Sequence, residues 1–139
     1  MIKARTIALI VAVGCFTAVP LTVLAEITVR IVPSGDIYMI DGDTAKIADI
    51  SYRLVGFDTP ETYEPQCDYE KALGDQATRR ARELVDRAGV VELVVLPGLD
   101  HYGRNLARMY VEGRDIGTIL INEGLARVYL KGRRQSWCN

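Results

Sequence analysis

Two short acidic segments carry the residue types that hold a hard metal ion. They are Asp41-Gly42-Asp43-Thr44 and, further along, Asp58-Thr59-Pro60-Glu61. Ca²⁺ takes several oxygen ligands, mostly carboxylates and carbonyls. Asp43 lies at the start of one expected strand and Asp58 at the end of another, so a hairpin-like sheet would bring the two carboxylates together. Each segment also has a simpler interpretation, because Asp-Gly-Asp is typical of a turn and the second segment could cap a loop or helix.

Two arginines accompany the acidic segments. Arg53 lies inside an expected strand, where an arginine of a small barrel needs either an internal carboxylate or a bound phosphate as its partner. Arg104 ends the segment Asp100-His101-Tyr102-Gly103-Arg104, which would project from a loop. A guanidinium can bind phosphate through two parallel hydrogen bonds, and Tyr102 can stack on a base. Taken alone, this segment is also typical of a loop with an exposed arginine, and His101 is interpreted as a surface residue.

The elements that would position these residues follow from the apolar pattern and the turn signals. Apolar residues recur at spacings of three and four over residues 68–88 and predict a helix that ends at Gly89. Its arginines at positions 79, 80 and 82 are interpreted as a solvated face. A shorter helix is expected over residues 115–123. Strands are expected over residues 27–32, 37–40, 44–50, 52–57, 90–96 and 106–111. This order predicts an α+β fold, mainly β, in which helices pack on a small β-barrel.

The N-terminal segment differs from the rest of the chain. Lys3 and Arg5 precede an uncharged run that ends at Ala25. A positive start, an apolar stretch and a small residue before a polar sequence are typical of a secretory signal, with cleavage expected after Ala25. The run also has the length of about 20 residues that can span a bilayer. An uncleaved anchor and a lipoprotein acylated on Cys15 therefore stay open. A cleaved signal would make residues 26–139 a periplasmic or secreted domain, and the alternatives would hold them at a membrane outside the cytoplasm.

Charge and cysteine content limit the classes of function. The net charge of −1 lacks the basic surplus that is usual for a nucleic-acid binder. However, residues 26–76 are mainly acidic and residues 77–139 mainly basic. This division suits a metal site beside a polyanion site, although chance patterning also produces it. Outside the N-terminal segment, Cys67 and Cys138 predict a disulfide in an exported domain, with two free thiols as the alternative. Two cysteines and one histidine are too few for a zinc site with four protein ligands.

In their order along the chain, these segments resemble the staphylococcal nuclease family. The resemblance rests on Asp-Gly-Asp-Thr at 41–44, on Arg53 followed by Asp-Thr-Pro-Glu at 58–61, on Asp-x-Tyr-Gly-Arg at 100–104 and on Gly-Leu-Ala-Arg at 124–127. It covers residues 37–129. The resemblance implies an OB-fold, a five-stranded β-barrel with two to three packed helices. It also implies a monomeric nuclease that acts on DNA or RNA, with no obligate protein partner and membrane association only if the N-terminal segment is retained.

The resemblance further implies a role for individual residues. Asp43 and Asp58 match the ligands of a bound Ca²⁺, and the backbone carbonyl of Thr59 matches a third. Glu61 matches the general base that activates water. The residues that match the two phosphate-binding arginines are Arg53 and Arg104. The tyrosines expected at the substrate are Tyr102 and Tyr129.

The sequence also departs from the family's pattern. His101 stands where the family often has a lysine, and the acidic residues after the signal outnumber the basic ones, so a weaker grip on nucleic acid is expected. Trp137 and Cys138, outside the matching region, are interpreted as a clasp that docks the tail. The arginine pair at 133–134 is either solvated or at the binding groove. A non-catalytic binding module on the same barrel and an unrelated exported structural domain remain the competing hypotheses.

Overall fold

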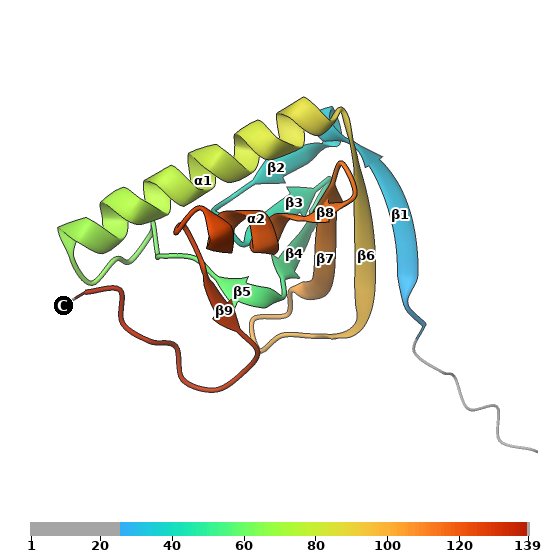
Figure 1. Cartoon of the computed structure of the whole chain (residues 1–139). Helices are drawn as coiled ribbons and strands as arrows, with labels where there is room; N and C mark the ends of the chain where they lie inside the picture. The colour runs from blue at the N-terminus through green and yellow to red at the C-terminus, as the bar shows by residue number, and fades with distance from the viewer. Residues whose placement is uncertain (1–25, 139) are drawn as a thin grey trace, which may run out of the picture.

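The structure, a computed structural model, describes residues 26–138. The expected signal segment and its cleavage site therefore lie outside the described residues. A curled sheet, a long helix and a short helix make up the fold (Figure 1). The main sheet contains β1 (Thr28–Pro33), β2 (Ile37–Met39), β3 (Thr44–Ile47), β4 (Ile50–Leu54), β6 (Val90–Leu99), β7 (Asn105–Val111) and β8 (Arg114–Asp115). A second sheet pairs β5 (Gly56–Asp58) with β9 (Arg127–Tyr129), and the helical elements are η1 (Ser34–Asp36), α1 (Asp68–Ala88) and α2 (Ile116–Asn122).

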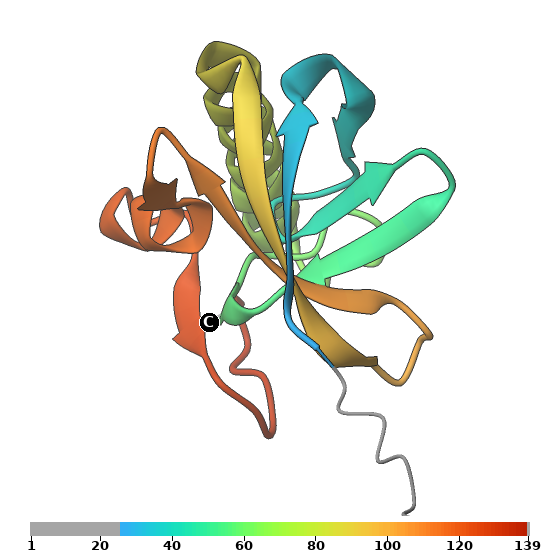
Figure 2. The ribbon, with the colours of Figure 1, turned by 90° about the vertical axis from the view of Figure 1, so that its right-hand side faces the viewer.

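The main sheet curls into part of a barrel (Figure 2). Its strand order is β1-β6-β7-β4-β3-β2, and β8 pairs with β7. Neighbouring strands are antiparallel except β4 and β7, which run parallel with Tyr52 opposite Asn105. The helix α1 lies across one end of the curled sheet (Figure 1). The predicted α+β architecture, an OB-like curled sheet with packed helices, is confirmed.

The long helix forms where the apolar spacing predicts it. Ala77, Ala81 and Leu84 are buried, and Gly89 ends the helix with a φ of 68°. A left-handed φ favours glycine, which has no Cβ to clash. A Cβ at Gly74 would lie 2.7 Å from the carbonyl oxygen of Pro60. Gly74 therefore lets the helix approach the loop that carries Glu61.

Two of the helix arginines are not the solvated residues that the sequence predicted. Arg80 donates to the Glu123 carboxylate at 2.8 Å, and Arg82 donates to the carbonyl oxygen of Met39 at 2.9 Å. Both arginines are half-buried, whereas Arg79 is exposed as expected. The pattern of one helix cannot show partners that come from elsewhere in the chain, and here they come from the end of α2 and from β2.

The expected strand over residues 52–57 is divided in the structure. β4 ends at Leu54, and β5 begins at Gly56, whose φ of 98° breaks the extended backbone. β5 then leaves the main sheet and pairs with β9, so that Asp58 lies opposite Arg127. The sequence did not predict β9. The strand expected over residues 44–50 is likewise interrupted, because Ala48 adopts a φ of 52° in the turn between β3 and β4.

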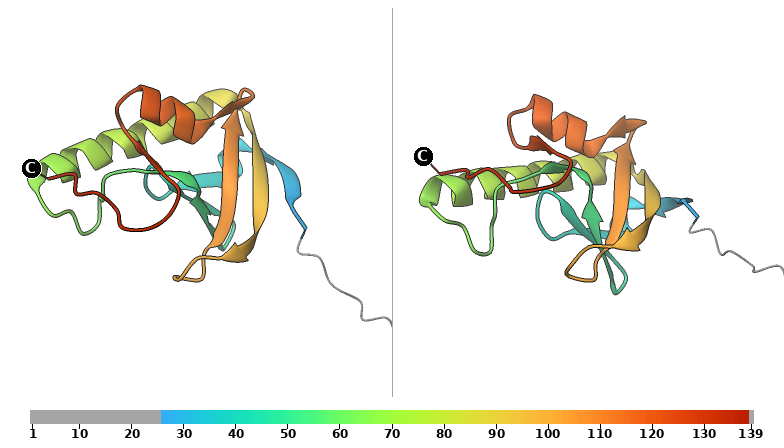
Figure 3. Two further views of the ribbon diagram at one scale, coloured as in Figure 1. Left: turned by 60° about the horizontal axis from the view of Figure 1, so that its bottom comes forward. Right: turned by 90° about the horizontal axis from the view of Figure 1, so that it is seen from below.

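Cys67 and Cys138 are joined by a disulfide, which is the pairing expected from the sequence. It ties the C-terminal segment to the N-terminal end of α1, and Figure 3 shows that segment running between β9 and this end of the helix. In residues 26–138, no helix is long and apolar enough to cross a membrane.

Reducing this disulfide is expected to lower the free energy of unfolding by about 4 kcal/mol, because the bridge closes a long loop and restricts the unfolded chain. The two cysteines are 71 residues apart in the sequence. Denaturant unfolding with and without dithiothreitol measures the change. The double variant Cys67→Ser/Cys138→Ser is the control and should not respond to the reductant. Equal unfolding midpoints for the wild type in both buffers would contradict the prediction.

Candidate active site

The chemistry-bearing residues singled out in the sequence line two adjoining hollows. The larger is a cleft of about 690 Å³. Six of the predicted site residues line it: Asp43, Arg53, Glu61, Tyr102, Arg104 and Tyr129. Asp58 and Thr59 line the second hollow, which shares Glu61 and Arg134 with the first. The fold thus brings together residues that lie far apart in the sequence.

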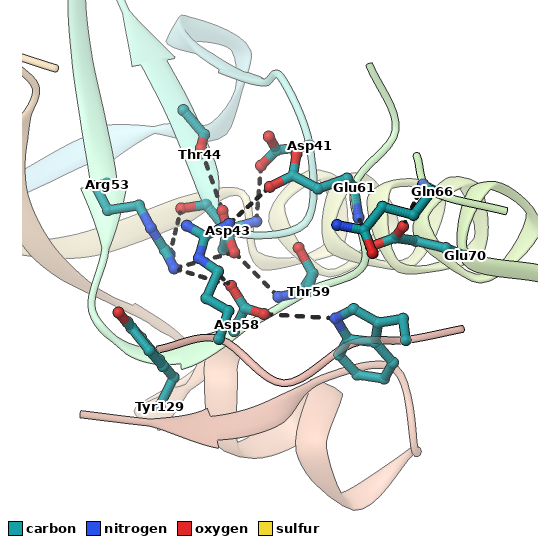
Figure 4. A network of polar contacts seen from close by, with 12 residues as sticks. Asp41, Asp43, Thr44, Arg53, Asp58, Thr59, Glu61, Gln66, Glu70 and Tyr129 are labelled. Atoms are coloured by element: carbon teal, nitrogen blue, oxygen red, sulfur yellow. Dashed lines mark hydrogen bonds and ion pairs between the residues drawn. The ribbon is translucent and has the colours of Figure 1, made fainter. Parts of the chain in front are cut away.

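The two aspartates predicted as metal ligands lie close together and face the Arg53 guanidinium (Figure 4). Arg53 Nη2 is 3.2 Å from Asp43 Oδ2 and 3.6 Å from Asp58 Oδ1. Asp43 Oδ2 also accepts a hydrogen bond from the backbone N–H of Thr59 at 3.0 Å. A Cβ on Gly42 would lie 2.6 Å from the Thr59 side chain. Glycine at this position therefore allows the turn before β3 to close onto the segment after β5.

The donor set of this acidic pair fits a hard cation. Asp58 Oδ1 is buried and has no hydrogen-bond partner among the described residues. Hard cations prefer carboxylate and carbonyl oxygens, as well as water. No group of three or more histidine, cysteine, aspartate or glutamate side chains in residues 26–138 is arranged to hold a metal ion by itself. A cation at Asp43 and Asp58 would therefore need backbone carbonyl and water ligands, and Thr59 is the adjacent buried residue.

A third aspartate joins the cluster. Asp41 lines the cleft, and its Oδ1 accepts a hydrogen bond from the backbone N–H of Asp43 at 3.0 Å. Burial and the negative charge of Asp43 raise the pKa of Asp41 to about 6. Burial also raises the pKa of Asp58, although the Arg134 guanidinium opposes this effect. Burial is the largest cause of both shifts, so these carboxylates lie in a poorly hydrated site where a bound cation would favour their ionised forms.

Asp41→Asn is expected to stabilise the metal-free protein at neutral pH. The pKa of Asp41 is about 6 in the folded protein against an ordinary 3.8. The folded chain therefore favours the protonated form of Asp41 and is destabilised by its ionised form. The stability that the protonated form contributes is fully present below about pH 3.8 and is lost as the pH rises through 6. At pH 7.5 the variant should gain up to about 3 kcal/mol in free energy of unfolding, and the gain should vanish near pH 4.

Denaturant unfolding in a chelating buffer at the two pH values measures this difference. The amide of the variant can still accept the hydrogen bond from Asp43. Asp36→Asn, on an exposed aspartate of η1, is the control for a general loss of negative charge. A gain for Asp41→Asn that is the same at both pH values would show that its ionisation does not affect folding.

The two arginines predicted to bind phosphate are held by different partners. Arg53 is 6% exposed, and besides its two carboxylate contacts it donates to the carbonyl oxygen of Phe57 at 3.0 Å. Arg104 Nε donates to Asp100 Oδ2 at 2.7 Å, and its Nη1 donates to Thr44 Oγ1 at 3.1 Å. Asp100 Oδ1 also accepts from the backbone N–H of Arg104. Asp100 thus fixes the rim loop and the direction of Arg104, a role that the sequence analysis did not assign.

Glu61 is the most accessible carboxylate of the group, with 46% of its side chain exposed. Its backbone N–H lies 3.4 Å from Glu70 Oε1, and Glu70 Oε2 accepts from the backbone N–H of Gln66 at 2.6 Å. Glu70 is buried at the start of α1, and through these two contacts it holds the loop between Glu61 and Gln66. The sequence analysis missed this role, because an acidic residue in the first turn of a helix is ordinary.

A family model described as staphylococcal nuclease homologue matches residues 51–137. The chain belongs to the staphylococcal nuclease family. It is similar to endonuclease YncB of Bacillus subtilis (strain 168), with 41% identity over 97 residues that cover 64% of this chain and 44% of the relative. It is also similar to the SPbeta prophage-derived endonuclease YokF of the same organism, with 39% identity over 97 residues, 64% of this chain and 31% of the relative. The chain thus spans less than half the length of either relative.

The match corrects the expectation for the tail. The motifs that resemble the nuclease family end at residue 129, whereas the matched region extends to Trp137. Trp137 is buried, and its indole Nε1 donates to Asp58 Oδ2 at 3.4 Å. The tail is a clasp as expected, but it also contributes side chains to the site. The segment Asp41–Thr44 lies outside the matched region, so its place in the site rests on the geometry.

The two tyrosines expected at the substrate flank the cleft of this family member. Tyr102 is 72% exposed, and the Arg104 guanidinium carbon lies 5.3 Å from its ring centroid. Tyr129 is half-buried, and its hydroxyl donates to the carbonyl oxygen of Gly132 at 2.8 Å. His101 is exposed beside Tyr102, in agreement with its interpretation as a surface residue. An exposed ring such as Tyr102 is free to stack on a base.

Proposed function

We propose that this chain is a nuclease that hydrolyses phosphodiester bonds of DNA or RNA with a bound Ca²⁺. One observation carries the proposal: in a member of the staphylococcal nuclease family, the acidic pair, a half-exposed glutamate and two arginines line adjoining hollows. Two similar proteins are named endonucleases, which supports the same reaction. Asp43, Asp58 and the carbonyl oxygen of Thr59 would hold the cation.

The chain's own residues divide the work of hydrolysis. Glu61 is open to solvent, so its carboxylate can orient a water molecule and take its proton as that water attacks phosphorus. Negative charge then grows on the phosphate oxygens, and Arg53 and Arg104, which both line the cleft, can stabilise it with hydrogen bonds. A bound Ca²⁺ would add positive charge beside the phosphate. Neither arginine is a proton donor at ordinary pH, so the leaving oxygen takes its proton from another donor.

The experiment incubates the purified protein with end-labelled single-stranded DNA and RNA in Ca²⁺ and separates the products by length. The proposal expects shorter fragments from at least one polymer. Tight binding of nucleic acid without fragments would instead favour the competing hypothesis of a binding module on the same fold. Neither binding nor cleavage of any polymer would contradict both hypotheses.

We further propose that the protein acts outside the cytoplasm as a periplasmic or secreted monomer. Two features support export: the signal-like N-terminal segment and the disulfide between Cys67 and Cys138. Disulfides persist in oxidising compartments and are rare in the cytosol. Fractionation of cells that express residues 1–139, followed by intact-mass measurement, tests export and cleavage after Ala25 together. Recovery of the protein in the cytosol with its first 25 residues would contradict the proposal.

A further inference from the structure

A segment that the proposed mechanism does not use lies across the acidic part of the site. It comprises residues 130–138, which follow β9, and we call it the C-terminal strap. The strap is fastened along its length. Arg127 Nη1 donates to the carbonyl oxygen of Ser136 at 2.9 Å, and its guanidinium carbon lies 3.7 Å from the centroid of the Trp137 ring. The disulfide to Cys67 fixes the far end of the strap.

The strap places the Arg134 guanidinium on two carboxylates of the proposed machinery. Arg134 Nε is 3.1 Å from Asp58 Oδ1, and its Nη1 donates to Glu61 Oε1 at 2.6 Å. Asp58 Oδ1 is buried, and although it forms this ion pair it accepts no well-directed hydrogen bond from residues 26–138. Arg134 lines both hollows, so it stands at the boundary between the acidic pair and the cleft.

Arg134 is bound by the charge of the whole cluster. Burial lowers the pKa of Arg134, but the negative charges of Asp58, Asp43 and Glu61 outweigh that effect and hold the pKa above its ordinary value. The guanidinium therefore supplies positive charge where the proposed cation would supply it. A fixed positive charge this close to a divalent cation repels it, and the two compete for the same carboxylate oxygen.

We propose that Arg134 is a built-in competitor of the divalent cation, which pairs with Asp58 and Glu61 in the metal-free protein and sets the Ca²⁺ concentration at which the site fills. This inference rests on the proposed function, since it takes Asp58 as a metal ligand. Cation binding releases Asp58 from the guanidinium. It also frees the Glu61 carboxylate from an ion pair that would hold it away from a water molecule.

The chain carries its own reporter for the test. Trp137 is its one tryptophan, and the indole Nε1 is 3.4 Å from Asp58 Oδ2. A change at Asp58 should therefore alter the tryptophan fluorescence, and titration of the chelator-treated protein with CaCl₂ gives the dissociation constant without any substrate. Isothermal titration calorimetry measures the same constant independently.

Arg134→Gln is expected to lower the dissociation constant for Ca²⁺ about tenfold, the size of effect that one removed neighbouring charge gives at a partly exposed position. Arg134→Lys keeps the charge and should stay within about threefold of the wild type. Arg133→Gln removes the same charge from the adjacent exposed residue, which lines the second hollow but has no ion pair with Asp58 or Glu61 among the described residues, and should change the constant by less than about threefold.

An unchanged or weaker affinity in Arg134→Gln, with the wild type binding Ca²⁺, overturns the inference and leaves the proposed metal site standing. Absence of binding in both proteins overturns the inference together with that metal site. An equal gain in Arg133→Gln would show that net charge, not the contact with Asp58, sets the affinity, and it also overturns the inference. Circular dichroism of each variant verifies that the fold is kept.

Discussion

Glu61→Gln should reduce the rate of phosphodiester cleavage by about 10²–10⁴-fold, the usual contribution of a positioned general base. The variant keeps the size of the side chain and removes only its ability to take a proton. The fold should tolerate the change. The ion pair between Glu61 and Arg134 joins side chains that are 46% and 38% exposed. Ion pairs between exposed side chains contribute at most about 1 kcal/mol to the free energy of unfolding.

The control for this variant lies in the same loop. Glu64 is exposed, and Glu64→Gln makes an identical chemical change three residues further along the chain. Initial rates on a labelled oligonucleotide at saturating Ca²⁺ compare the two variants with the wild type. Equal losses in both variants, or full activity in Glu61→Gln, would remove Glu61 from the role of general base.

Arg53→Lys should lower the cleavage rate by about 10²–10³-fold, as the loss of one donor to a developing oxyanion does. A guanidinium presents a planar fork of donors, whereas an ammonium is a point charge that cannot reproduce it. In the structure Nη2 contacts Asp43, Asp58 and the Phe57 carbonyl oxygen, while Nη1 donates to the carbonyl oxygen of Asp43. Some stability should therefore be lost as well, and the assay belongs at a temperature at which the variant is folded.

Arg79→Lys is the matched change at an exposed arginine of α1 and should leave the rate unaltered. A further comparison separates catalysis from substrate binding. The loss in Arg53→Lys should appear in kcat, since the contact strengthens as charge develops on the phosphate. A variant with normal kcat and only a raised KM would make Arg53 a binding residue.

Much of this fold is predictable from local patterns. Apolar residues recur at helical spacing along all 21 residues of α1, and the helix ends at a glycine with left-handed φ. The bounds of α1 therefore agree with the prediction. An even number of cysteines after the N-terminal segment likewise indicated the disulfide. The site residues were identified because their order along the chain resembles one family, not because any single motif is specific.

Other features depend on contacts that a local pattern does not encode. β5 and β9 have three residues each, and they exist as strands because Gly56 turns the chain out of the main sheet toward the segment after α2. The sequence left the arginine pair at 133–134 either solvated or at the binding groove, and the path of the strap, fixed by the disulfide and Trp137, is what places Arg134 at the site. In both cases the segments that contact each other are far apart in the sequence, so neither their charges nor their spacing produces a periodic pattern.

We propose that a Ca²⁺ bound at Asp43, Asp58 and Thr59 is required for phosphodiester cleavage. The most direct test measures the cleavage rate of chelator-treated protein while Ca²⁺ is added back, for the wild type and for Asp43→Asn. We expect no cleavage in chelator and full recovery of the wild type with Ca²⁺. Asp43→Asn should require at least about tenfold more Ca²⁺, because one charged ligand is lost. Cleavage that persists in chelator, or the same Ca²⁺ dependence in both proteins, would contradict the proposal.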